Sequence, residues 1–241
     1  MKYSYTIGGG DPCVKVLPVR HATTDIPKGA AVMRGVSDDT NEPFIGVAAG
    51  SFADIIGVLE ELVDNADTDS AIGGTAILRA KIGINPMNVY LAEYDQSDTL
   101  AETSASSTTT FNCTSIEGIA GGWLYAITGS AAGELQWVAS DDTNSVVTKS
   151  AFTTTGGSDT FIKILPQFHL LAKLVTAGDK IGSDAGAGSA PVLVLENYIE
   201  ATNIPYQRLD PTKHSGLDLT GLSPKFYAEI LFRDHALNPL S

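Results

Sequence analysis

The pentapeptide Ser-Asp-Asp-Thr-Asn occurs twice, at residues 37–41 and 140–144, and it concentrates the oxygen-bearing side chains that bind calcium. A calcium loop of the EF-hand type needs oxygen ligands at alternating positions, a central glycine and a late glutamate. Neither copy continues in that way, because Glu42 and Pro43 follow the first copy and Ser145 follows the second. Since Ser, Asp and Asn favour turns by bonding their own backbone, we interpret both copies as hairpin turns.

The remaining candidate residues do not form a catalytic or metal-binding motif. The four histidines are His21, His169, His214 and His235, and none stands in an H-x-x-x-H or H-E-x-x-H pattern. The chain has no G-x-S-x-G nucleophile elbow, and the glycine-rich segment 182–191 lacks the third glycine and the following helix of a dinucleotide fingerprint. The sequence therefore predicts no catalytic, cofactor-binding or metal-binding residues and favours a structural or binding role. A β-rich hydrolase with a dispersed site is the enzymatic alternative.

The elements that would position any site are mostly β-strands. Apolar or alternating runs predict strands at residues 13–22, 28–36, 42–50, 74–84, 88–95, 160–166, 191–199 and 225–232. The last run is the clearest, because its apolar residues alternate onto one face: Phe226, Ala228, Ile230 and Phe232. Strands do not alternate with long helices, so a doubly wound α/β fold is disfavoured.

Two segments have helical spacing. Residues 166–178 are predicted to form an amphipathic helix, with Pro166 suited to its start and Gly178 to its end. Residues 51–67 also have apolar side chains at helical intervals, but Gly57 weakens a helix there. An extended strand is the equally supported alternative for that second segment.

The predicted fold class is mainly β: a barrel-like or sandwich-like body with one or two short helices and a peripheral β-hairpin unit. Apolar runs at 121–129, 133–140 and 145–152 predict a set of β-hairpins, and stretches rich in Ser and Thr at 103–110 and 153–159 flank this set. We therefore expect residues 1–102 to form the first part of the body with an extended N-terminal arm. Residues 103–158 would form the inserted unit, and residues 159–241 would complete the body.

The net charge of the chain limits the classes of partner that it is expected to bind. Lys and Arg number 15 against 28 Asp and Glu in 241 residues, which gives a net charge of −13. A chain this acidic is not expected to bind nucleic acid by neutralising phosphates. No run reaches transmembrane length and no apolar signal region opens the chain, so we expect a soluble protein made in a cytoplasm. In that setting Cys13 and Cys113 are expected to be free thiols.

The N-terminal segment offers candidate interface residues. Tyr3, Tyr5 and Ile7 alternate along a short extended stretch, and three glycines follow at 8–10. Such a tethered strand could add to the sheet edge of a neighbouring subunit through backbone hydrogen bonds. A frayed chain end is the alternative interpretation.

The segment 24–51 contains a strand, a polar turn and a second strand. Its pattern is carried by Ile26, Lys28, Gly29, Val32, Pro43, Ile45, Gly46 and Val47. This segment resembles the small β domain of tailed-phage head decoration (cement) proteins. The C-terminal course, residues 209–236, also resembles a phage structural protein.

The resemblance implies a virion protein without enzymatic activity or cofactor. It would sit on the outside of an icosahedral phage head, often as a trimer, and bridge neighbouring major capsid subunits, with no direct contact to nucleic acid or membrane. It would be made in the host cytoplasm. The alternatives are another virion part (tail, baseplate or host-binding protein) and a cellular β-sandwich binding module. A carbohydrate-stacking aromatic cluster would favour host binding, but none is evident in the sequence.

Overall fold

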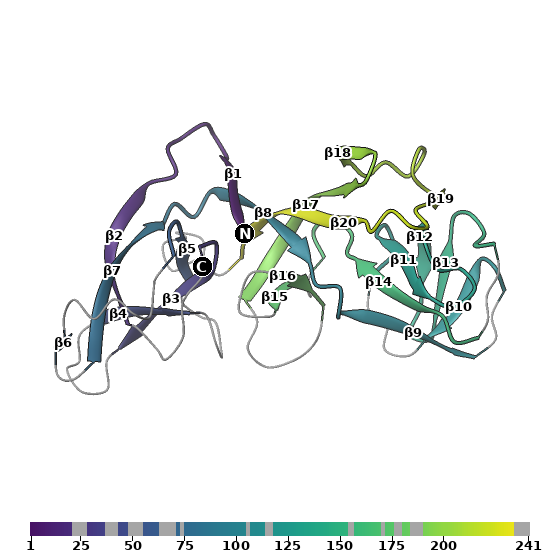
Figure 1. Cartoon of the computed structure of the whole chain (residues 1–241), viewed down its shortest axis with the longest axis horizontal. Coiled ribbons are helices and arrows are strands. Elements are labelled where there is room, and N and C mark those ends of the chain that lie inside the picture. Colours follow the sequence, from purple (N-terminus) through teal and green to yellow (C-terminus); the bar gives the residue numbers. More distant parts are fainter. Residues whose placement is uncertain are drawn as a thin grey trace.

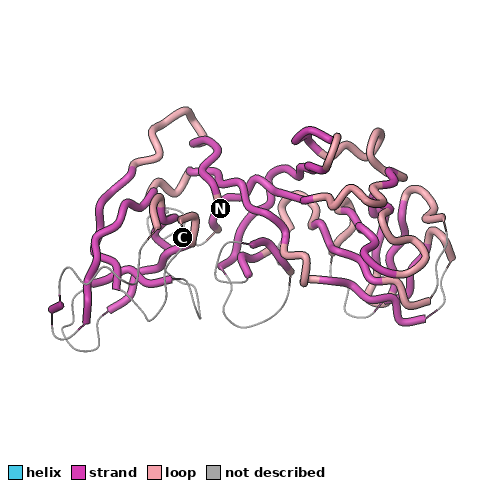
Figure 2. The backbone as a smooth tube through the Cα atoms, in the orientation of Figure 1, coloured by secondary structure: helices cyan, strands magenta, loops and turns pink. Residues whose placement is uncertain are grey.

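The structure is a computed structural model of the chain. It describes residues 1–20, 28–36, 43–47, 55–62, 71–72, 75–104, 107–113, 118–153, 157–169, 172–175, 180–183 and 190–233. Within these ranges every regular element is a β-strand (Figure 2), which confirms the predicted mainly β class. In the same ranges, no helix is long and apolar enough to span a membrane.

Five strands near the N-terminus close into a small barrel. They are β2 (Val14–Arg20), β4 (Pro43–Val47), β3 (Ala31–Val36), β5 (Ile55–Leu59) and β7 (Thr75–Gly83), in that spatial order. Pairing of β2 with β7 completes the ring, and the short β6 (Ala71–Ile72) pairs with β7. The buried interior consists of small and branched side chains: Ala30, Val32, Leu59, Ala80 and Ile82. The predicted β-barrel is thus confirmed.

A second closed ring follows in the sequence. Its strands are β11 (Trp123–Thr128), β14 (Thr160–Ile164), β9 (Thr99–Ser104), β10 (Thr110–Cys113), β13 (Ser145–Thr148) and β12 (Glu134–Asp141). The β11–β12 pairing closes the ring, and β19 (Leu217–Asp218) pairs with β12. Inside, Phe111, Phe152 and Phe161 pack with ring centroids 4.9–5.4 Å apart. The described strands between residues 103 and 158 belong to this ring, which also uses the flanking strands β9 and β14.

A seven-stranded sheet, called here the middle sheet, lies between the two rings (Figure 1). Its strands are β1 (Lys2–Thr6), β8 (Asn88–Tyr94), β16 (Lys180–Gly182), β15 (Lys173–Val175), β17 (Ala190–Ala201), β18 (Ile204–Arg208) and β20 (Lys225–Phe232). One face packs on the six-strand ring, where the Tyr125 and Phe226 rings lie 5.3 Å apart. Within the middle sheet, Tyr94 Oη on β8 donates to Asn197 Oδ1 on β17 at 2.8 Å in a buried contact.

Strand β20 has the predicted alternation. Phe226, Ala228, Ile230 and Phe232 are buried, while the intervening residues face outward. The outward face of β20 carries polar and aromatic side chains, among them Tyr227 and Glu229.

The predicted helix over 166–178 is wrong. Residues Lys173–Val175 form strand β15, which pairs with both β16 and β17. Before that strand, Phe168 has a φ of 58° and is 61% exposed, so it does not join an apolar helix face. Backbone pairing to strands on both sides outweighs a weak helical periodicity.

The ambiguous segment 51–67 is a strand in its described part. Residues Ile55–Leu59 form β5 inside the five-strand barrel. Gly57 allows this close packing, because a Cβ atom there would lie 2.0 Å from the carbonyl oxygen of Gly83. The glycine that weakens a helix thus permits the approach of β5 to β7.

Candidate functional site

The N-terminal strand does not present its three candidate residues on one surface. A bulge between Tyr3 and Tyr5 breaks the alternation. Tyr3 turns inward, where its ring lies 6.3 Å from that of Tyr90 and its hydroxyl lies 2.9 Å from Thr6 Oγ1. Tyr5 and Ile7 stay exposed, at 43% and 41%.

The same strand belongs to the protein's own sheet. It pairs with β8, and the amino group of Met1 donates to the carbonyl oxygen of Gly29 at 3.1 Å. Thr6 Oγ1 donates to Asn88 Oδ1 at 2.8 Å in a buried contact. Among the described strands, β1 pairs with β8. An interface role for Tyr3, Tyr5 and Ile7 stays a prediction.

The outward face of the middle sheet gathers three tyrosines from three strands. The rings of Tyr198 and Tyr206 are stacked, with centroids 4.7 Å apart and an interplanar angle of 10°. The Tyr227 ring lies 5.9 Å from Tyr206 at 62°. Tyr206 is 44% exposed, and Tyr198 stands directly opposite Tyr227 in the β17–β20 ladder. These rings form a continuous aromatic surface.

Glutamate carboxylates lie close to the tyrosine hydroxyl groups of this surface. Tyr227 Oη donates to Glu200 Oε2 at 3.2 Å. Burial and the nearby Glu229 raise the pKa of Tyr198 to about 12, and the same two causes raise the pKa of Tyr5. Glu229 also accepts a hydrogen bond from Ser4 Oγ at 3.1 Å. We call the set Tyr5, Tyr198, Tyr206, Tyr227, Glu196, Glu200, Glu229 and Arg208 the tyrosine face.

Cations compensate part of the negative charge here. Arg208 Nε lies 2.8 Å from Glu196 Oε2, and its side chain is 66% exposed. On the same sheet, Lys180 Nζ lies 2.7 Å from Glu93 Oε2. The tyrosine face has three carboxylates and one guanidinium, so it presents aromatic rings, hydrogen-bond donors and acceptors, and a net negative charge.

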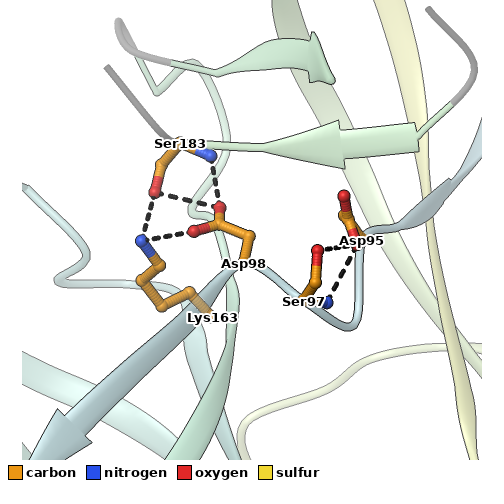
Figure 3. A network of polar contacts seen from close by, with 5 residues as sticks. All are labelled: Asp95, Ser97, Asp98, Lys163 and Ser183. Atoms are coloured by element: carbon orange, nitrogen blue, oxygen red, sulfur yellow. Dashed lines mark hydrogen bonds and ion pairs between the residues drawn. The ribbon is translucent and has the colours of Figure 1, made fainter. Parts of the chain in front are cut away.

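A buried polar cluster joins the middle sheet to the six-strand ring (Figure 3). Lys163 Nζ, on β14, lies 2.7 Å from Asp98 Oδ1 and donates to Ser183 Oγ at 2.6 Å. The backbone N–H of Ser183 donates to Asp98 Oδ2 at 2.5 Å, and Ser183 Oγ lies 3.2 Å from the same oxygen. The Lys163 and Asp98 side chains are 15% and 9% exposed.

A serine beside a lysine can serve nucleophilic catalysis when the lysine acts as a base. Here Lys163 Nζ forms an ion pair with the Asp98 carboxylate, which occupies it in a structural contact. Asp98 also closes the turn from Asp95, whose carboxylate accepts bonds from the backbone and the hydroxyl of Ser97 (Figure 3). We interpret the cluster as a clamp between the two parts of the fold.

Two further acids lie inside the six-strand ring. Glu102 and Asp159 are 6% and 0% exposed. The Asp159 backbone contacts both the backbone and the side chain of Glu102: Glu102 N–H donates to Asp159 O at 2.9 Å, and Asp159 N–H donates to Glu102 Oε2 at 3.3 Å. Asp159 Oδ1 accepts the Ser130 N–H at 3.0 Å. Because both carboxylates lie beneath the surface, we interpret them as structural groups that fix this loop.

The second Ser-Asp-Asp-Thr-Asn copy forms the predicted turn, between β12 and β13. Asp142 Oδ1 accepts the N–H groups of Asn144 and Ser145 at 2.8 and 2.7 Å. The Asp141 carboxylate accepts the N–H groups of Ile119 and Ala120. The hydrogen bonds from Asn144 and Ser145 lower the pKa of Asp142. The first copy lies outside the described residues.

The other predicted groups are placed as follows. Cys13 is exposed and Cys113 is buried, and both are free thiols. His214 is buried, and its Nδ1 accepts the Asp210 N–H at 2.8 Å. His169 is also buried, while His21 and His235 lie outside the described residues. In the described ranges, no three His, Cys, Asp or Glu residues gather in a way that could hold a metal ion.

Of the tyrosine face, only Tyr5 was singled out from the sequence; Tyr198, Tyr206 and Tyr227 were missed because they come from three strands, β17, β18 and β20. A signal was nevertheless available: Tyr227 stands at an outward position of the alternating strand 225–232, where the other face is apolar. Outward tyrosines in half-buried strands could have been singled out. Their convergence depends on pairing of strands that are distant in sequence.

Comparison with known proteins returned no match: no family model, no curated protein and no solved structure matches this chain.

Proposed function

We propose that the protein is a virion structural protein, a capsid decoration protein that binds the outside of a tailed-phage head. Its partner is the major capsid protein, and its own assembly is a homo-oligomer, with a trimer favoured. It acts by binding alone, without a catalytic step. The proposal starts from the resemblance carried by residues 24–51, of which β3 and β4 form adjacent strands of the barrel.

One observation carries the proposal furthest: two closed β-rings stand at opposite ends of one sheet (Figure 1). Closed rings have no free strand edges, so they resist deformation and unwanted edge pairing. A body with two such ends can contact two neighbouring subunits at once. Bridging of this kind strengthens a shell against internal pressure.

The proposal is tested by searching the neighbouring genes for a major capsid protein and assembling shells from it, with and without the protein. We expect co-sedimentation with the shells, density on their outer surface by electron microscopy, and rupture at higher temperature. The decoration role would be excluded if the protein did not co-sediment with the shells and the rupture temperature of the shells stayed unchanged.

A second candidate function is host binding by another virion part. The exposed tyrosine face favours it, because surface aromatic clusters are enriched at recognition sites. The two functions are compatible, since one protein can bind a shell through one surface and a ligand through another.

A further inference from the structure

We propose that the tyrosine face of the middle sheet binds a neutral saccharide. This inference goes beyond shell binding and does not rest on it. The face combines an exposed stack of aromatic rings with hydrogen-bonding groups of both kinds, carried by adjacent strands of one sheet.

The aromatic part supplies the stacking surface. Tyr206 is 44% exposed although one side of its ring stacks on Tyr198 at 4.7 Å. An aromatic face is electron-rich, and the C–H bonds on one side of a pyranose ring present a weakly positive surface to it. Tyr227, at 5.9 Å from Tyr206, extends this surface toward β20.

The rings are held in place before any ligand arrives. Tyr198 and Tyr227 stand opposite each other in the β17–β20 ladder, and Tyr227 is further fixed by its bond to Glu200. Mutual packing restrains Tyr206 as well. A pre-organised platform loses little conformational freedom on binding, which favours even a small ligand.

Polar groups surround the platform and can bind hydroxyl groups. Arg208 is 66% exposed, and its guanidinium has several N–H donors besides the Nε that faces Glu196. Glu200 is exposed and has a second carboxylate oxygen beyond the one that binds Tyr227. A donor and an acceptor beside an aromatic ring match the adjacent hydroxyl groups of a sugar.

Charge decides the class of saccharide. The Arg208–Glu196 and Lys180–Glu93 pairs compensate two carboxylates of this sheet, while Glu200 and Glu229 leave the face negative, so a polyanionic ligand is disfavoured there. The chain as a whole carries −13, which repels sulfated or uronic-acid polymers. Among saccharides, a neutral hexose or N-acetylhexosamine oligomer therefore fits this face, and the oligo-arginine comparator tests whether its negative charge selects a cation instead.

The full chain should be screened on an array of neutral glucose, N-acetylglucosamine, mannose and galactose oligomers, followed by calorimetric titration of the best ligand. Heparin and an oligo-arginine peptide serve as polyanionic and polycationic comparators. We expect Tyr206→Ala to weaken binding about tenfold, the loss of one aromatic contact. Tyr206→Phe, which keeps the ring, should bind within about twofold of the original chain.

The exposed aromatic Phe168 lies outside the face, so Phe168→Ala is the matched control and should leave the affinity unchanged. Circular dichroism checks that each variant is folded. The inference is overturned if no neutral glycan binds, if Tyr206→Ala binds as well as the original chain, or if oligo-arginine binds while neutral glycans do not. None of these results would bear on shell binding, which the co-sedimentation assay measures separately.

Discussion

The Lys163–Asp98 pair should be one of the strongest polar contributions to stability in the described part of the fold. At 2.7 Å and an effective dielectric constant of about 20, the Coulomb attraction is about 6 kcal/mol. Desolvation of two side chains that are 15% and 9% exposed offsets much of this gain. The net contribution of the pair to the free energy of unfolding is measured by removing one partner and then both.

We expect Lys163→Met to lower the free energy of unfolding by about 3 kcal/mol, because the Asp98 carboxylate is left buried with only the Ser183 donors. Asp98→Asn should cost a similar amount. The double variant should cost less than the sum, with a coupling energy of about 2 kcal/mol. Urea unfolding followed by circular dichroism gives all four values.

The exposed Lys81–Glu61 pair is the control, at 3.6 Å and with side chains 60% and 39% exposed. Its double-mutant cycle should give a coupling below about 0.5 kcal/mol. If the Lys163–Asp98 cycle gave an equally small coupling, solvent would be screening the pair, and the clamp between the middle sheet and the six-strand ring would not exist.

Phe161→Ala, which empties the centre of the buried aromatic trio, should cost about 4 kcal/mol in urea unfolding, and a loss below about 1 kcal/mol would contradict the packing. The pKa values of Tyr198 and Tyr227 are raised from 10.0 to about 12, so both phenols should stay protonated in the folded state at pH values where an ordinary tyrosine ionises. Their stability contribution is then complete below pH 10 and is lost as the pH rises to about 12, which ultraviolet titration of tyrosinate and alkaline unfolding can follow. Because the pKa of Asp142 is lowered, its stabilising contribution is present at neutral pH and is lost as the pH falls through its folded-state pKa. Asp142→Ala should therefore lower the melting temperature at pH about 7 and have a smaller effect in acid. Added calcium should leave the melting temperature of the original chain unchanged; a saturable increase that Asp38→Ala or Asp141→Ala abolishes would show that the repeated pentapeptide binds the ion.

Features that depend on near neighbours in the chain were readable from the sequence. The turn at 140–144 is one, because Asp142 bonds backbone groups only two and three residues away. The strand at Lys225–Phe232 is another, because alternation of apolar side chains follows from backbone geometry whatever the strand pairs with. Together such local patterns were enough to predict the mainly β class.

Features that join distant segments were decided by the tertiary structure alone. Closure of the barrel pairs β2 with β7, and the clamp joins Asp98 to Lys163 and Ser183. No periodicity encodes which strand edges meet, since edge pairing is selected by the burial of the whole core. Segment 173–175 shows the consequence: its local pattern suits a helix, yet two neighbouring strands satisfy its backbone and make it a strand. The tyrosine face arose in the same way, because pairing in register brings together three rings that are scattered in the sequence.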